Sequence, residues 1–167
     1  MEKDNKLETV NNRPVLSKLV NNFLLFIVTC GFIGYLPGAP GTYASILGCI
    51  IAYFFTFNSV FGNAVFVCSL AVCSVVCINL LKYSGKDPSY IVIDELVGMF
   101  VTMTGFKPDL LNIISGFILF RFFDIIKPPP IRNVEHFKGG YGVVADDVLA
   151  GIFANMFMHL GYIIFKS

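Results

Sequence analysis

Apolar segments separated by short polar or Gly/Pro-rich stretches run through most of this chain and predict a bundle of helices. The segments that are long and apolar enough to be helices are residues 16–34, 43–57, 64–81, 90–104, 110–126 and 144–165. No charged residue lies between Lys18 and Lys82. A stretch of this length without charge cannot form the exterior of a soluble domain, so the pattern predicts an all-α integral membrane protein.

Proline, glycine and polar residues mark where the helices end. Residues 34–42 are predicted to be a loop because they contain two prolines and three glycines. Asn58-Ser59 and Gly62-Asn63 separate two helices, and residues 82–89 form a polar connection. A second loop is predicted at residues 131–142, after three consecutive prolines that cannot continue a helix.

The composition supports one membrane-embedded domain. Of the 167 residues, 56% are hydrophobic and only 14% are charged, against about 25% charged residues in a soluble globular chain. We expect residues 1–15 to be a solvated polar tail and residues 16–167 to form a single domain. The net charge of +1 and the lack of a basic helix argue against nucleic-acid binding. The five cysteines lie in apolar segments, where thiols pack as small hydrophobic groups.

Threading the predicted helices through a bilayer gathers the charged motifs on one side. If residues 37–42 lie on one face and each later helix crosses, residues 82–95 and 124–147 return to that face. Its loops carry the basic residues Lys82, Lys86, Lys127, Arg132 and Lys138. The positive-inside tendency makes this face cytoplasmic. The prediction is a helical bundle with about four membrane-crossing helices, in which residues 16–34 are interfacial or re-entrant.

Two adjacent acid pairs, Asp94-Glu95 and Asp146-Asp147, lie in otherwise apolar sequence. An acid at the centre of a bilayer costs about 2.5–3.5 kcal/mol, whereas a leucine or isoleucine returns only about 0.3–0.6 kcal/mol. Such acids need a compensating cation, partner or proton, and carboxylate oxygens suit Mg²⁺ or Mn²⁺. The competing interpretation is that each pair caps a helix N-terminus. Capping suits Asp146-Asp147, at the start of the last predicted helix, better than Asp94-Glu95, which lie several residues inside apolar sequence.

A third charged motif consists of Arg121, Asp124 and Lys127, in an apolar helix that ends at Pro128. Arg121 and Asp124 are three residues apart on a helix, so one interpretation is that they neutralise each other as an ion pair. In the other interpretation Asp124 binds metal, while Arg121 and Lys127 face the oxygens of a phosphate. The spacing alone leaves both interpretations open.

The Gly/Pro-rich stretch Leu36–Thr42 precedes a predicted helix. Backbone N–H groups at a helix N-terminus attract phosphate, so Gly41 and Thr42 are candidate phosphate contacts. The stretch is not a nucleotide-binding P-loop, because no Gly-Lys-Ser/Thr follows it. His136 and His159 are isolated, so hydrolysis would depend on metal-activated water or on a carboxylate.

Four strings occur in a characteristic order. They are Leu-Pro-Gly-Ala-Pro-Gly-Thr at 36–42, Val-Ile-Asp-Glu-Leu-Val-Gly at 92–98, Phe-Arg-Phe-Phe-Asp-Ile-Ile-Lys-Pro at 120–128, and Gly142 through Asp-Asp-Val-Leu-Ala at 146–150. Together they resemble the phosphatidylglycerophosphatase A family, over roughly residues 16–165. One departure is Tyr43-Ala44, where the family pattern leads us to expect a Gly-Ser-like pair; Ser45 follows one place later.

The resemblance implies Mg²⁺-dependent removal of the terminal phosphate from phosphatidylglycerophosphate. The product would be phosphatidylglycerol, made for phospholipid biosynthesis at the cytoplasmic face of a bacterial inner membrane. Under this hypothesis the catalytic and metal-binding residues are Asp94, Glu95, Asp124, Asp146 and Asp147. The substrate phosphate would be bound by Arg121, Lys127, Gly41 and Thr42.

Two other classes of protein fit parts of the pattern. A membrane cation transporter also carries acids within helices, but here the acids group toward one side, and Arg121 and Lys127 would repel the cation. A CDP-alcohol phosphotransferase also uses interfacial carboxylates and a divalent metal, but its acids follow an Asp-Gly motif and this chain has no Asp-Gly. Ion flux without phosphatase activity would favour the first class, and CMP-dependent headgroup exchange would favour the second.

Overall fold

The computed structural model describes residues 17–54, 59–81, 88–134 and 137–166, and these residues form helices and no strand. The predicted all-α class is therefore confirmed. The elements are an N-terminal helix Ser17–Val28, the 3₁₀ helix η1 (Ile33–Tyr35), α2 (Pro40–Phe54), α3 (Val60–Leu80), α4 (Ile93–Met103), α5 (Leu110–Ile126), α6 (Ile131–Val134) and α7 (Gly140–Lys166).

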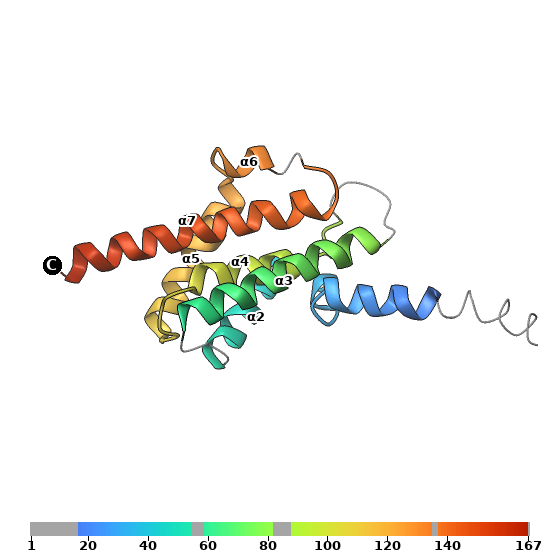
Figure 1. Cartoon of the computed structure of the whole chain (residues 1–167), viewed down its shortest axis with the longest axis horizontal. Helices are drawn as coiled ribbons and strands as arrows, with labels where there is room; N and C mark the ends of the chain where they lie inside the picture. Colours follow the sequence, from blue (N-terminus) through green and yellow to red (C-terminus); the bar gives the residue numbers. More distant parts are fainter. Residues whose placement is uncertain (1–16, 55–58, 82–87, 135–136, 167) are drawn as a thin grey trace, which may run out of the picture.

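Helix α4 is the centre of the bundle. It packs against α2, α3, α5 and α7, and nine of its 11 residues are buried. The long helix α7 also contacts α3 and α5 and extends along the whole bundle (Figure 1). The N-terminal helix projects from the end of the bundle that lies opposite the C-terminus (Figure 1). A short central helix surrounded by longer ones keeps its polar residues away from the outer surface.

Glycines allow α4 and α7 to approach closely. A Cβ atom at Gly98 of α4 would lie 2.8 Å from the backbone oxygen of Asp147, and one at Gly151 of α7 would lie 2.9 Å from Val101 Cβ. Thr102 Oγ1 donates to Gly98 O at 2.9 Å within this contact. Small residues at a helix crossing let two backbones come together. The crossing therefore brings Asp147 of α7 next to the first turns of α4.

Several helix starts differ from the sequence prediction. Helix α2 begins at Pro40, inside the stretch predicted to be a loop, because proline suits the first helical position, where its missing N–H is not needed. Helix α3 begins at Val60 with Ser59 as its N-cap, so Gly62-Asn63 lie within its first turns and do not break it. The predicted bounds of α5, residues 110–126, are confirmed.

Tertiary hydrogen bonds fix two further helix starts that the sequence prediction placed wrongly. Helix α4 begins at Ile93 and not near Tyr90, and Val92 N donates to Val28 O at 2.9 Å just before it. Helix α7 begins at Gly140 and not at residue 144, and Gly140 N donates to the side-chain oxygen of Asn79 at 2.9 Å. The predicted 131–142 loop thus contains α6 and the start of α7.

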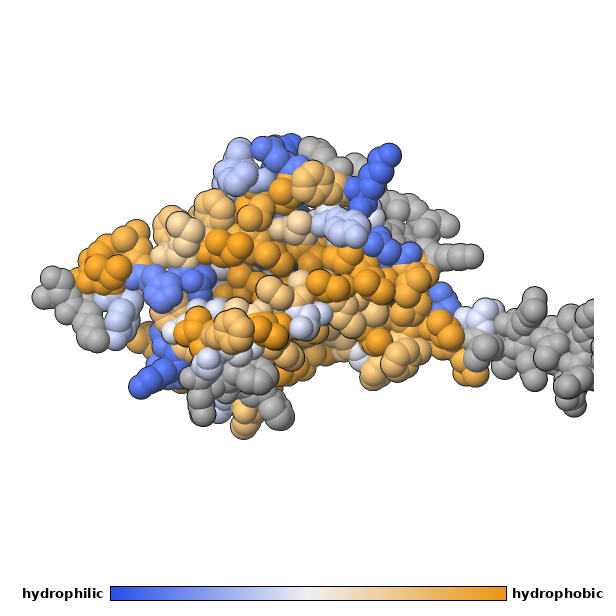
Figure 2. All heavy atoms as spheres, in the orientation of Figure 1, coloured by the Kyte–Doolittle hydropathy of each residue, from blue (hydrophilic) through white to orange (hydrophobic). Residues whose placement is uncertain are grey.

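Two helices, Val60–Leu80 and Gly140–Ile164, are long and apolar enough to cross a membrane. Helices α2, α4 and α5 have 15, 11 and 17 residues, fewer than the roughly 20 that a span requires. The predicted arrangement of about four crossings is therefore not confirmed. Hydrophobic side chains cover most of the visible face of the bundle (Figure 2), and such an extensive apolar surface is typical of contact with lipid or with a partner.

Three parts of the sequence prediction lie outside the described residues. They are the polar tail at residues 1–15, most of the polar connection at residues 82–89, and His136.

Candidate active site

The predicted charged residues meet in one cavity of about 330 Å³. Its lining comes from the start of α2, the start of α4, the end of α5 and the first turns of α7. The predicted site residues that line it are Gly41, Asp94, Glu95, Arg121, Asp124, Lys127, Asp146 and Asp147. Thr42 is half-buried and is not among the residues that line the cavity.

The structure reverses which acid pair lies at a helix start. Asp94 and Glu95 are in the first turn of α4, where the positive end of the helix dipole favours acids. Asp146 and Asp147 lie well inside α7, which begins at Gly140 and has no acid in its first turn. The capping interpretation is therefore wrong for Asp146-Asp147, and Asp94-Glu95 occupy the position that sequence reasoning considered less suitable.

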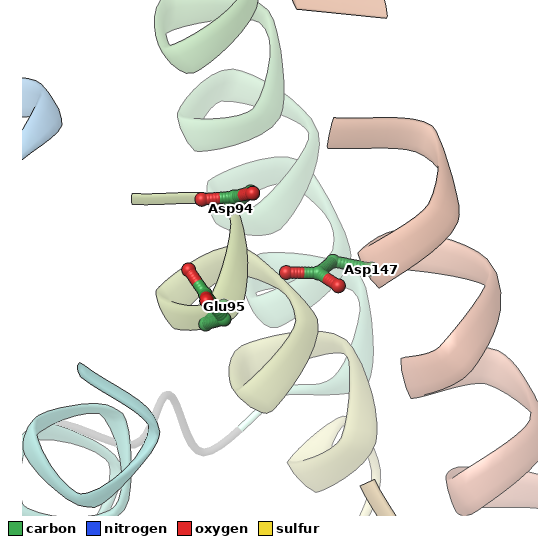
Figure 3. A group of neighbouring side chains, drawn as sticks. All are labelled: Asp94, Glu95 and Asp147. Atoms are coloured by element: carbon green, nitrogen blue, oxygen red, sulfur yellow. The ribbon is translucent and has the colours of Figure 1, made fainter. Parts of the chain in front are cut away.

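Three of the carboxylates that line this cavity form a compact group. Asp147 points from α7 toward Asp94 and Glu95 on α4 (Figure 3), and one oxygen from each lies within 4.8 Å of the others. Among the described residues, Asp94 Oδ1, Glu95 Oε2 and Asp147 Oδ2 are buried without a hydrogen-bond partner. Buried like charges need a cation or protons. Because all the donors are hard carboxylate oxygens, the residues present fit Mg²⁺ or a similar divalent cation.

The other two acids are paired with basic side chains. Asp124 Oδ2 accepts a hydrogen bond from Arg121 Nη1 at 2.6 Å, as the ion-pair interpretation predicted. Asp146 Oδ2 accepts from Lys127 Nζ at 2.5 Å. Each of these two acids therefore faces a cation, while the group of Asp94, Glu95 and Asp147 does not contain them. Whether Asp124 and Asp146 also bind metal stays a prediction.

Each ion pair leaves a buried polar atom available to a ligand. Arg121 Nε and Asp146 Oδ1 are buried and have no hydrogen-bond partner in the part of the chain that the structure describes. The Lys127 side chain is 28% exposed and that of Asp146 is 7% exposed, so the lysine end of this pair reaches solvent while the carboxylate is buried. The cavity thus offers a donor that suits a phosphate oxygen and an acceptor that suits a proton.

Two polar residues lie beside the site to which the sequence analysis gave no role there, Cys30 and Ser45. Cys30 is half-buried, and its burial, followed by the negative charge of Glu95, raises the pKa of the thiol to about 12. It is therefore a neutral thiol and not a nucleophile near neutral pH. Ser45 is fully buried one turn after Gly41, and its hydroxyl oxygen accepts from Arg121 Nη1 at 3.5 Å. The spacing of four residues from Gly41, on one face of a helix, was the available signal.

Comparison with known proteins identifies the family. A model of the family described as phosphatidylglycerophosphatase A matches residues 26–162. The chain belongs to this family. The matched range includes all four strings on which the resemblance was based, so that prediction is confirmed. No solved structure matches this chain significantly.

Curated relatives cover most of the chain. A protein of Haemophilus influenzae named phosphatidylglycerophosphatase A is 36% identical over 87% of this chain and 92% of its own length. A protein of the same name from Escherichia coli is 32% identical over 81% of this chain and 80% of its own length. A Bacteroides thetaiotaomicron protein named putative phosphatidylinositol-3-phosphatase is 38% identical over 80% of this chain and 90% of its own length. All three names describe phosphatases of lipid phosphomonoesters.

Proposed function

We propose that this protein is a Mg²⁺-dependent lipid phosphatase that hydrolyses phosphatidylglycerophosphate to phosphatidylglycerol and phosphate in phospholipid biosynthesis. Family membership supports the activity and the substrate. The observation that carries the proposal is the cavity itself, which combines a buried group of three carboxylates with Arg121 and Lys127. This combination suits a phosphomonoester, whose hydrolysis requires neutralisation of negative charge.

The residues of the cavity have distinct roles in this proposal. A divalent cation held by Asp94, Glu95 and Asp147 would supply Lewis-acid neutralisation of charge on the phosphate. Arg121 donates its buried Nε–H to a phosphate oxygen, while its Nη1 stays bound to Asp124.

Asp146 and Lys127 complete the proposed mechanism. Asp146 accepts from Lys127 through Oδ2 and keeps Oδ1 available, so we assign Oδ1 as the atom that takes a proton from the attacking water. The bond from phosphorus to the lipid oxygen breaks, Lys127 gives a proton to that oxygen, and the proton on Asp146 restores the Lys127 ammonium. Lys127 adds positive charge near the phosphate and holds the Asp146 carboxylate in place.

We further propose that the protein lies in a bacterial inner membrane with about four crossings, the N-terminal helix at the interface and the cavity facing the cytoplasm. Two helices of spanning length and the apolar surface support a membrane location. The basic residues of the loops on the cavity side support the orientation. The starts of α2, α4 and α7 and the end of α5 all meet at the cavity, so the helices before α7 return the chain to the cavity face. Helix α7 then crosses once more, and the C-terminus would be periplasmic. A C-terminal alkaline phosphatase fusion should be active and a fluorescent-protein fusion dark; the reverse pattern would refute the orientation.

A phosphate-release assay on the full-length protein in detergent micelles tests the activity. Phosphatidylglycerophosphate, phosphatidylinositol-3-phosphate and phosphatidic acid are compared, each with Mg²⁺ and with EDTA. We expect preferential, EDTA-sensitive hydrolysis of phosphatidylglycerophosphate. Preference for the inositol lipid would move the proposal to the substrate named for the Bacteroides relative. EDTA-resistant hydrolysis would contradict the metal assignment.

Amide variants test the carboxylate group within the same assay. Asp94→Asn and Asp147→Asn should each lower kcat/KM about 100-fold or more, since changes to residues that only hydrogen-bond a metal ligand already cost metal sites about 10–100-fold. Asp109→Asn is the matched control, because Asp109 is an exposed cap at the start of α5 and an asparagine there also caps. Full activity in Asp94→Asn would show that the metal assignment is wrong.

A further inference from the structure

Ser45 lies beside the cavity, and its buried hydroxyl group connects α2 to Arg121 of α5. Its side chain is 0% exposed, and its Oγ donates to Gly41 O at 2.8 Å. The same oxygen accepts from Arg121 Nη1 at 3.5 Å. A serine hydroxyl has one proton and two acceptor lone pairs, so Ser45 can make both contacts at once.

The close approach of α2 makes this contact possible. A Cβ atom at Gly41 would overlap Glu95 Oε1 and would lie 3.3 Å from Arg121 Nη1. A Cβ atom at Gly48, two turns along α2, would lie 2.9 Å from Met99 Cβ. The first turn of α2 is therefore packed directly against Glu95 and Arg121, and Ser45 supplies a hydroxyl group to this contact.

The Arg121 guanidinium is held from two sides and has a donor left over. Its Nη1 carries two N–H groups, and Asp124 Oδ2 and Ser45 Oγ provide an acceptor for each. Its Nε is buried, with no hydrogen-bond partner among the described residues. In a guanidinium the Nε–H belongs to a planar fork of donors that matches the oxygens of a phosphate. Fixing Nη1 thus fixes the direction of the Nε edge.

We propose that Ser45 is a positioning residue, which holds the Arg121 guanidinium so that its Nε edge meets the substrate phosphate. Asp124 lies on the same helix as Arg121, three residues away, so the two side chains can shift together. Ser45 lies on a different helix and prevents that shift. This inference rests on the proposed function, because the phosphate is the ligand that Arg121 binds.

The matched control for Ser45→Ala is Ser74→Ala. Ser74 is also 0% exposed and its Oγ donates to Leu70 O at 2.8 Å, but it lies in α3 and, among the described residues, has no hydrogen bond to Arg121. We expect Ser45→Ala to raise KM for the lipid and the Kd for inorganic phosphate about fivefold or more, because one hydrogen bond to a charged group is lost. Ser74→Ala should leave both constants at wild-type values while lowering thermal stability comparably.

A double-mutant cycle separates positioning from general packing. In an Arg121→Lys background, Ser45→Ala should add no further loss, because the guanidinium it positions is gone. An undiminished loss in that background would overturn the proposal, as would equal constants for Ser45→Ala and Ser74→Ala. If Ser45→Ala does not fold, Ser45→Cys keeps the shape with a weaker acceptor and should give an intermediate Kd. A wild-type Kd in Ser45→Cys would then overturn the proposal.

The phosphate-binding measurement also distinguishes failure of this inference from failure of the proposed function. Inorganic phosphate binding to the full-length protein, measured calorimetrically with Mg²⁺ present, does not require turnover of any lipid. Absence of lipid hydrolysis by the wild-type protein would overturn the proposed function, while a weaker phosphate Kd in Ser45→Ala would still support the positioning role.

Discussion

The glycine at the crossing of α4 and α7 gives a sharp test of how the carboxylate group is held together. In Gly98→Ala the new Cβ would lie 2.8 Å from the backbone oxygen of Asp147 and 2.7 Å from Phe120 Cζ. Another atom of that ring, Phe120 Cε2, would lie closer still, so the fully buried ring must move in any case. An ordinary contact begins at 3.4 Å, so α7 must also retreat by about 0.6 Å. The backbone that retreats is that of Asp147 itself, and Gly98 lies one helical turn after Asp94, so the distance between these two carboxylates changes.

This displacement is large on the scale of metal coordination. Distances in a functional metal site hold to within about 0.2 Å, so a retreat of this size should raise the Mg²⁺ concentration for half-maximal phosphate release about tenfold or more. Overpacking of a core typically costs about 1–3 kcal/mol. We therefore expect Gly98→Ala to lower both the thermal midpoint and the apparent Mg²⁺ affinity.

Two other glycines provide controls for this variant. A Cβ at Gly161 of α7 meets nothing within 4 Å. Gly161→Ala should therefore raise the free energy of unfolding by up to about 1 kcal/mol, through the higher helix propensity of alanine, and leave the Mg²⁺ dependence of phosphate release unchanged. A Cβ at Gly116 of α5 would lie 3.1 Å from the flexible Met103 and 3.2 Å from Met158. Gly116→Ala should cost some stability with unchanged Mg²⁺ dependence. A wild-type Mg²⁺ requirement in Gly98→Ala, together with the stability of Gly161→Ala, would refute the reasoning.

Three further outcomes are expected. Mg²⁺ at 100 times Kd should add about 2.7 kcal/mol to the free energy of unfolding of the wild-type protein and so raise its thermal midpoint. It should not raise the midpoint of Asp147→Asn, and an equal rise in both would place the cation elsewhere. Cys30→Ser should keep full activity and the same pH profile near neutrality, because a thiol with a pKa of about 12 stays protonated there. Asn79→Ala removes the acceptor of Gly140 N and should lower the free energy of unfolding by about 1 kcal/mol, read from thermal unfolding.

The apolar pattern was sufficient to predict the class of the fold and most of its helices. It predicted the bounds of α5 correctly because Asp109 caps its start and a run of prolines follows its end. It failed at the starts of α4 and α7, where the helix begins at a hydrogen bond from another part of the chain. Val28 O and Asn79 Oδ1 are those partners, and a contact over about 60 residues leaves no local signal.

The same limit applies to the site. Threading the helices through a bilayer predicted that the charged residues gather on one side. Five acids and two basic residues in apolar sequence are stable only when they pair with one another or with a cation. The division into a carboxylate group and two ion pairs did not follow, because it depends on side-chain distances of a few ångströms. The spacing of three residues offered the Arg121–Asp124 ion pair as one of two interpretations, but nothing in the sequence indicated that Asp146 faces Lys127.

The charge of the cavity predicts an order of binding. Its five carboxylates and two basic side chains give a net charge of −3 when all are ionised, so a phosphate monoester dianion would be repelled. A divalent cation would reduce that charge and directly attract the phosphate, and by linkage phosphate would strengthen cation binding by the same factor. Inorganic phosphate binding to the full-length protein should therefore be detectable with Mg²⁺ and lost in EDTA. Equal phosphate affinity in the two conditions would mean that Arg121 and Lys127 alone bind the anion, and that the carboxylate group serves another purpose.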